Sequence, residues 1–266
     1  MRRLRPGRLL LAGVASLVYL FLQLPLLIVF PISFSSAQYL QFPPPGWSLQ
    51  WYERYLNSPN WLTPTWLSLK VAVATTVLSL LLGVPLAFGL TRARFWGRDV
   101  IEKLSMAPII VPTIVLSIAL YGVFAKLKLI GVWYGIAVAH TLLALPFVVA
   151  LVVAGLRDFD VNQELAALGL GASRWRAVWH VTLPQIRPSL VSAAFLAFIS
   201  SFDELVVAMF LGGANMTLPK KMFDNIRMEI DPTIAAISAL QIALISALLL
   251  LVVRFGRGAL TITKGA

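Results

Sequence analysis

Two adjacent acidic residues, Asp203 and Glu204, interrupt an apolar run that extends from about residue 189 to residue 211. A carboxylate near the centre of a membrane-spanning helix costs about 2.5–3.5 kcal/mol to insert, so two of them need cations, water or protons nearby. Such a pair suits a cation site on a transport path. The alternative is structural pairing with lysines expected near the outer membrane surface, namely Lys70, Lys220 and Lys221. Both interpretations stay open at this point.

The remaining chemically capable residues give no catalytic pattern. His140 and His180 lie too far apart in the sequence for metal-ligand spacing. His140 falls in the middle of an apolar run without an acidic neighbour in sequence, which favours a hydrogen-bonded packing role over a proton relay. The sequence has no phosphate-binding G-x-x-x-x-G-K-[ST] loop, no nucleophile elbow, no zinc-protease motif and no Cys. We therefore predict a non-catalytic protein with no metal or cofactor of its own.

The composition indicates a membrane-embedded helical fold around these residues. The 266 residues are 59% hydrophobic and only 12% charged, with a mean hydropathy of +0.85. A soluble domain carries about 25% charged residues. Because backbone groups in hydrocarbon must be satisfied within the spanning segment, long apolar runs predict an all-α bundle rather than a barrel. We expect six transmembrane helices, at about residues 9–34, 66–90, 103–126, 128–157, 189–211 and 233–253.

The net charge of +11 reports orientation in the membrane rather than affinity for nucleic acid. Fifteen of the 22 Lys and Arg residues lie in the two tails and in the connections after the second and fourth spans, and seven lie in the alternate connections. The positive-inside rule then places both termini in the cytoplasm. The predicted organisation is a cytoplasmic tail at 1–8, a transmembrane domain at 9–254 that includes a loop at 157–188, and a cytoplasmic tail at 255–266.

The loop at 157–188 is the longest cytoplasmic connection, and we predict that it folds. Residues 162–170 are rich in helix formers, Gly171 can end that helix, and Ser173 can cap a second one over residues 173–181. Two short helices of this kind would dock into another protein or lie along lipid headgroups. Two aromatic residues on one helical face and two prolines before the next span complete the pattern, namely Trp175, Trp179, Pro184 and Pro188.

One run of residues in this loop carries a family resemblance. A Leu-Ala-Ala run, a Gly-Ala-Ser run and a Leu-Pro pair follow at fixed spacing, as Leu165, Ala166, Ala167, Gly171, Ala172, Ser173, Leu183 and Pro184. They resemble the EAA motif of the permease subunits of bacterial ATP-binding-cassette (ABC) importers. In that family the loop carries a coupling helix that inserts into a groove on the cytoplasmic ATPase, so we name residues 157–188 the coupling loop.

The chain departs from this motif at its acidic position. Counting back from Gly171, Leu165 stands where the family usually has Glu, and the nearest acid is Glu164, one residue earlier. One position corresponds to about 100° around a helix. Either Glu164 makes the family contact with an altered geometry, or that contact is absent.

Segments 201–208, 217–219 and 226–233 further resemble the spermidine/putrescine subgroup of these permeases, and the similarity covers about residues 66–253. The resemblance implies a type I ABC importer permease fold in the bacterial inner membrane. It also implies transport of a small cationic solute, a polyamine such as spermidine or putrescine, past Asp203 and Glu204. Members resembling this subgroup also import thiamine, ferric iron and other small solutes, including amino-acid-like amines, which stay as alternatives.

The resemblance also implies the partners. We expect an ATPase dimer that holds ATP and Mg, a second permease subunit in a heterodimer, a periplasmic or lipid-anchored solute-binding protein, and membrane lipid, but no nucleic acid. Two other classes of protein fit the sequence less well. An ion-coupled secondary transporter would be expected to show an inverted repeat with paired broken helices, and none is visible in the sequence. An intramembrane enzyme would need a pair of catalytic groups, which is missing.

Overall fold

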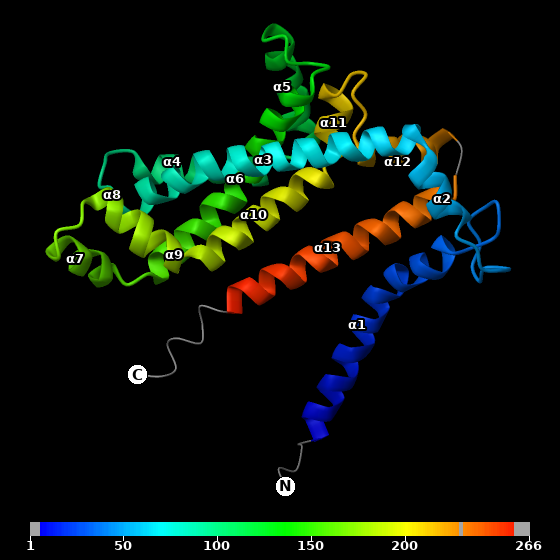
Figure 1. The fold of residues 1–266 in the computed structure, drawn as a ribbon, viewed down its shortest axis with the longest axis horizontal. Coiled ribbons are helices and arrows are strands. Elements are labelled where there is room, and N and C mark those ends of the chain that lie inside the picture. Colours follow the sequence, from blue (N-terminus) through cyan, green and yellow to red (C-terminus); the bar gives the residue numbers. More distant parts are fainter. Residues whose placement is uncertain (1–5, 229–230, 258–266) are drawn as a thin grey trace. The chain divides into compact units, whose positions relative to one another are not determined.

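The computed structural model describes residues 6–228 and 231–257, and the regular secondary structure of this part of the chain is helical apart from one isolated bridge between Ser35 and Trp47 (Figure 1). The helices with at least six residues are α1 (Pro6–Ser33), α2 (Gln50–Asn57), α3 (Pro59–Arg92), α4 (Arg98–Ile110), α5 (Thr113–Lys126), α6 (Trp133–Asp158), α7 (Val161–Gly169), α10 (Arg187–Phe202), α11 (Val206–Leu211), α12 (Leu218–Met228) and α13 (Thr233–Arg257). Three shorter turns lie between α7 and α10, namely α8 (Arg174–Ala177), the π-helical turn η1 (Val178–Thr182) and α9 (Leu183–Gln185).

The chain divides into two compact units, of which the first comprises residues 1–62 and 224–244. In this unit α2 is a short amphipathic helix that the sequence interpretation did not predict. Its Trp51 is buried and donates a hydrogen bond from Nε1 to the carbonyl oxygen of Ser35 at 2.9 Å. Asp231 accepts hydrogen bonds from the backbone N–H and the hydroxyl of Thr233, at 2.9 and 2.6 Å, and so caps the start of α13.

The second unit comprises residues 63–223 and 245–266 and is built around α6. α6 packs along α10, and its residues Val148, Val149 and Val152 are fully buried. The side chain of Val148 also contacts α3 at Gly83, where a Cβ atom would lie only 2.6 Å from Val148 Cγ1. The absence of a side chain at Gly83 therefore lets α3 and α6 approach closely.

The predicted span at residues 103–126 is not one continuous helix. α4 and α5 form a bent pair with an angle of 107° between them, interrupted at Val111 and Pro112. Pro112 has no backbone N–H to donate, and it disfavours helical geometry in Val111, whose φ and ψ are −76° and 128°. Pro112 therefore accompanies a complete break in the helix rather than a kink.

Four helical segments in the described residues are long and apolar enough to cross a membrane. They are Leu11–Ser33, Pro59–Arg92, Trp133–Asp158 and Thr233–Arg254. The bent pairs Arg98–Ile110 with Thr113–Lys126, and Arg174–Gln185 with Arg187–Phe202, raise the count to six if each pair makes one span. Six spans therefore agree with the fold, and the cytoplasmic location of the termini stays a prediction.

The boundaries of several predicted elements shift in the structure. α3 begins at Pro59 rather than near residue 66, because the N–H groups of Trp61 and Leu62 already bond to the carbonyl of Ser58. α1 begins at Pro6 and α13 extends to Arg257, so both helices reach into the predicted tails. Residues 1–5 and 258–266 of those tails lie outside the described residues.

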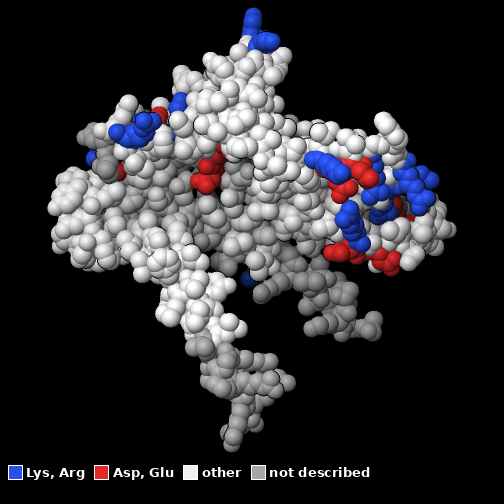
Figure 2. Space-filling model, turned by 180° about the vertical axis from the view of Figure 1, so that it is seen from behind, with Lys and Arg blue, Asp and Glu red and all other residues white. Residues whose placement is uncertain are grey.

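Charged side chains gather at one end of the second unit. Figure 2 shows basic and acidic residues close together over the end formed by α4, α7 and α8, beside a broad uncharged surface. The exposed charged residues of these elements and of the α3–α4 loop include Arg94, Asp99, Lys103, Arg174 and Arg176. Uncharged surface of this kind suits lipid, and the charged end suits water.

Candidate functional site

The coupling loop folds into two helical parts joined at a glycine, as the sequence predicts. The side chain of Asp160 accepts a hydrogen bond from the N–H of Asn162 at 3.0 Å and caps α7. Ser173 accepts from the N–H of Arg176 at 3.3 Å and caps α8. Gly171, between the two, has φ of +89°, a backbone conformation that L residues with side chains rarely adopt.

The second helical part continues as η1 and α9, and it breaks only at Ile186 before α10 turns away by 72°. This break follows Pro184 and precedes Pro188, in agreement with the sequence prediction. Trp175 and Trp179 pack edge to face with ring centroids 6.1 Å apart, and they are 72% and 55% exposed. Two large aromatic rings therefore stand on the outer surface of the loop.

Glu164 faces the chain itself rather than the outer surface. Its Oε2 accepts a hydrogen bond from the hydroxyl of Thr182 at 2.8 Å and lies 3.1 Å from Nη2 of Arg92. Leu165, the neighbour at the usual acidic position of the motif, is 57% exposed. Glu164 thus joins α7 to η1 and to the end of α3, and the surface beside it is apolar.

The predicted span at residues 189–211 breaks at its two acids. α10 ends at Phe202 and α11 begins at Val206, and Asp203 and Glu204 lie between them. The carboxylate of Glu204 accepts hydrogen bonds from the N–H groups of Val206, Val207 and Ala208, at 3.0, 2.8 and 3.2 Å. A continuous helix would satisfy those N–H groups with the carbonyls of residues 202–204, so the side chain of Glu204 replaces the helical hydrogen bonds at the break.

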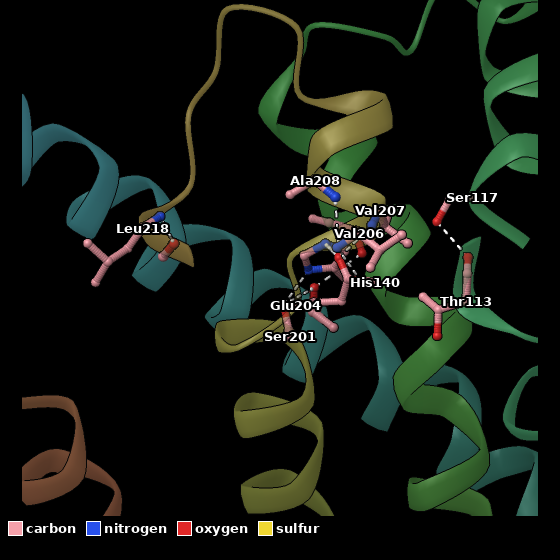
Figure 3. Close-up of polar contacts among 12 residues, drawn as sticks. Thr113, Ser117, His140, Ser201, Glu204, Val206, Val207, Ala208 and Leu218 are labelled. Atoms are coloured by element: carbon pink, nitrogen blue, oxygen red, sulfur yellow. Dashed lines mark hydrogen bonds and ion pairs between the residues drawn. The ribbon is translucent and has the colours of Figure 1, made fainter. Parts of the chain in front are cut away.

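His140 lies directly against this break, as the close-up in Figure 3 shows. Its Nε2 is 3.3 Å from Oε2 of Glu204, and its Nδ1 is 2.9 Å from Oγ of Ser201. The histidine side chain is 1% exposed and the glutamate side chain 9% exposed. The predicted hydrogen-bonded role of His140 is confirmed, but its pairing with Glu204, 64 positions further along the chain, has no signal in the sequence.

Asp203 differs from Glu204 in having no partner among the residues that the structure describes. The residue is exposed, and its carboxylate makes no hydrogen bond or ion pair within the described chain. Two lysines considered as partners are engaged elsewhere: Lys70 Nζ lies 3.8 Å from the ring centroid of Trp133, and Lys220 donates to the carbonyl of Gly213 at 3.1 Å. The structure therefore separates the two acids into a partnered and an unpartnered carboxylate.

These features together define a class of protein. The described chain has long apolar helices, one helical run that breaks at two acidic side chains, and a folded loop that exposes aromatic residues at the charged end. The described residues contain no cluster of three or more His, Asp or Glu that could hold a metal. This combination fits the membrane-spanning permease subunit of a transporter.

A family model described as "Binding-protein-dependent transport system inner membrane component" matches residues 79–261. The chain belongs to this family of ABC importer permeases. It is 30% identical over 241 residues to the spermidine/putrescine transport system permease protein PotC of Escherichia coli K12, with 90% of each protein covered. It is 31% identical over 225 residues to the sulfate transport system permease protein CysT of the same strain, with 80% of this chain and 77% of the relative covered.

Solved structures support the same fold. A bacterial ABC transporter involved in the import of the acidic polysaccharide alginate contains a chain that superposes with a TM-score of 0.69 at 19% identity, covering 100% of this chain and 98% of its own. The family match and the sequence relatives favour the ABC importer permease over the secondary-transporter alternative, as expected from the coupling loop.

Proposed function

We propose that this permease subunit passes a small cationic solute of the polyamine type, such as spermidine or putrescine, across the bacterial inner membrane. The observation that carries the proposal is the carboxylate of Asp203. It lies at a break between α10 and α11 and has no partner within the described chain. An unpartnered acid is costly inside a membrane unless it faces water or a cation, and such residues commonly mark transport paths.

The charge of the solute rests on Asp203 because family membership alone does not fix it. The relatives at about 30% identity include one named for polyamines and one named for sulfate, which carry opposite charges. A carboxylate attracts an ammonium group and repels a sulfate. Asp203 therefore favours the cationic solute, and Glu204 contributes through the geometry of the break.

Energy for transport would come from a separate ATPase dimer that binds ATP and Mg and docks against the coupling loop in the cytoplasm. The exposed side chains of Leu165, Leu170, Trp175 and Trp179 offer an apolar surface for that contact. A second permease subunit, different in sequence so that the two form a heterodimer, would complete the importer together with a periplasmic or lipid-anchored binding protein. Both termini of the chain would then lie in the cytoplasm.

The test is uptake by the complex purified with its chromosomal neighbours and reconstituted into vesicles. Asp203→Asn removes the charge and keeps the size, and we expect it to lower uptake of labelled putrescine or spermidine while ATP hydrolysis continues. Asp203→Glu keeps the charge and is the matched control. Unchanged uptake by Asp203→Asn would contradict the proposal, and competition by thiamine or ferric iron but not by polyamines would redirect it to another solute.

A further inference from the structure

Two buried hydroxyl groups next to the helix break, those of Thr75 and Ser201, form hydrogen bonds whose donors and acceptors can be assigned. The hydroxyl of Thr75, on α3, lies 3.2 Å from the carbonyl oxygen of Ala137, and a carbonyl oxygen only accepts. Thr75 therefore uses its one hydroxyl proton in that bond. Ser201 Oγ lies 3.2 Å from Thr75 Oγ1, so Ser201 must be the donor in the contact between the two hydroxyls.

The same assignment of donors and acceptors places a proton on Nδ1 of His140. Because Ser201 has already donated its hydroxyl proton, it can only accept from His140, so Nδ1 of His140 carries a proton. Nε2 is then the ring atom that faces the carboxylate of Glu204 at 3.3 Å. That carboxylate accepts three backbone hydrogen bonds from α11, which is the behaviour of an ionised acid. The contact with Nε2 is an ion-pair distance without hydrogen-bond geometry, so the charge of the carboxylate is compensated when Nε2 carries a proton.

We propose that His140 is a positioning residue, held as an imidazolium with both ring nitrogens protonated, that fixes Glu204 as the charge-compensated cap of α11. The pair carries one positive and one negative charge and is almost completely buried. Glu204 is consequently occupied by the protein itself, and Asp203 is the carboxylate of the break that a solute can reach. This last step rests on the proposed function, whereas the state of the histidine does not.

The mechanism of positioning follows from the elements that the network joins. Thr75 lies on α3, His140 on α6, Ser201 on α10 and Glu204 in the break before α11. Loss of the imidazolium leaves the carboxylate buried without a compensating charge, which favours a rearrangement of the break. The orientation of α11 and of Asp203 relative to α6 therefore depends on His140.

The protonation state can be measured directly because the chain has only two histidines. The full-length chain carrying His180→Gln, labelled with 15N in histidine and reconstituted in vesicles at neutral pH, should give nitrogen resonances of a doubly protonated ring. Adding Glu204→Gln should remove the proton from Nε2 and leave Nδ1 protonated. An unprotonated Nδ1 in the parent, or a ring unaffected by Glu204→Gln, would overturn the proposal.

The positioning role can be measured by cysteine labelling because the chain has no Cys. Met209 is 38% exposed on α11, and Met209→Cys gives a single site for a maleimide. We expect His140→Leu and Glu204→Gln each to change the labelling rate several-fold, and the double variant to change it no more than the stronger single one. His140→Gln, which keeps a donor toward Glu204, should restore part of the parent rate.

Thr141→Val is the matched control for this experiment. Thr141 is the buried neighbour of His140 on α6 and donates its hydroxyl to Ala137 within its own helix, at 2.7 Å. A change as large as that of His140→Leu, or multiplicative effects in the double variant, would overturn the positioning role. If the labelling and NMR results are as expected but Asp203→Asn takes up the solute at the parent rate, the positioning role of His140 stands. Only the proposed cationic solute is then contradicted.

Discussion

Arg92, at the end of α3, and Glu164, in α7, form an ion pair with 3.1 Å between Nη2 and Oε2. The two side chains are 27% and 15% exposed, and Thr182 donates a hydrogen bond to the same carboxylate oxygen. A long apolar helix and the coupling loop are thus tied together by a partly buried charged contact. The acid nearest the usual acidic position of the motif is thus bonded to residues of its own chain.

We predict that Glu164→Gln weakens the connection between the coupling loop and α3. Hydrogen bonds to charged groups contribute about 1.5–3 kcal/mol, so loss of this charge should allow the loop to move independently. The measurement is the ratio of solute imported to ATP hydrolysed by the reconstituted complex, which should fall. Glu102→Gln is the control, because its pair with Arg157 at 3.5 Å is exposed and should be worth about 0–1 kcal/mol. Equal ratios in both variants would contradict the prediction.

A second prediction concerns the exposed aromatic pair of the coupling loop. Trp179→Ala removes an edge-to-face contact worth about 0.5–1.5 kcal/mol and opens the surface proposed for ATPase docking. We expect less ATPase to copurify with this variant. Trp96, which is 99% exposed between α3 and α4, is the matched control, and Trp96→Ala should leave copurification unchanged. Loss of the ATPase in the control variant would point to a different docking surface.

The contact between α3 and α6 predicts opposite effects at two glycines of one helix. Gly83→Ala would place a Cβ atom 2.6 Å from Val148 Cγ1, and overpacking of this kind costs about 1–3 kcal/mol. Gly89→Ala meets nothing within 4 Å and should gain up to about 1 kcal/mol from helix propensity. Thermal unfolding in detergent should therefore show a lower midpoint for the first variant and an unchanged or higher one for the second.

Two buried serines on α3 provide a comparable pair. Ser68 Oγ accepts a hydrogen bond from the N–H of Leu218 at 2.8 Å, so Ser68→Ala leaves a buried donor unsatisfied at a cost of about 1–3 kcal/mol. Ser79 is fully buried, and its hydroxyl has no partner in the described part of the chain. Ser79→Ala should be neutral or stabilising in the same unfolding measurement. A larger loss of stability at Ser79 would show that its hydroxyl is satisfied in the membrane.

Features set by local chemistry could be predicted from the sequence. The two helical parts of the coupling loop follow from the cap at Ser173 and the glycine at Gly171, and both residues have the predicted roles. The apolar runs likewise predict the positions of α1, α3, α6 and α13. In each case the determining interactions lie within a few residues of one another.

Features set by distant contacts could not be predicted. Asp203 and Glu204 are adjacent acids in the sequence, and only the fold places His140 beside Glu204 and leaves Asp203 exposed. The pairing of Glu164 with Arg92 likewise joins positions 72 residues apart. Pro112 marks a break in the third apolar run, but the angle of 107° depends on the helices that pack around α4 and α5.

The close approach of Gly83 to Val148 is a contact about which α3 could tilt. Arg92 lies nine residues beyond that contact and Thr75 eight residues before it, which at 1.5 Å per residue corresponds to about 13.5 and 12 Å along the helix. If α3 tilted as one body about this contact, despite Pro85 between Gly83 and Arg92, a sideways displacement of Arg92 would be matched at Thr75 by one of similar size and opposite direction. A displacement of the coupling loop at the charged end of the unit would thus move the hydroxyl of Thr75, which begins the network leading to His140, by a similar distance.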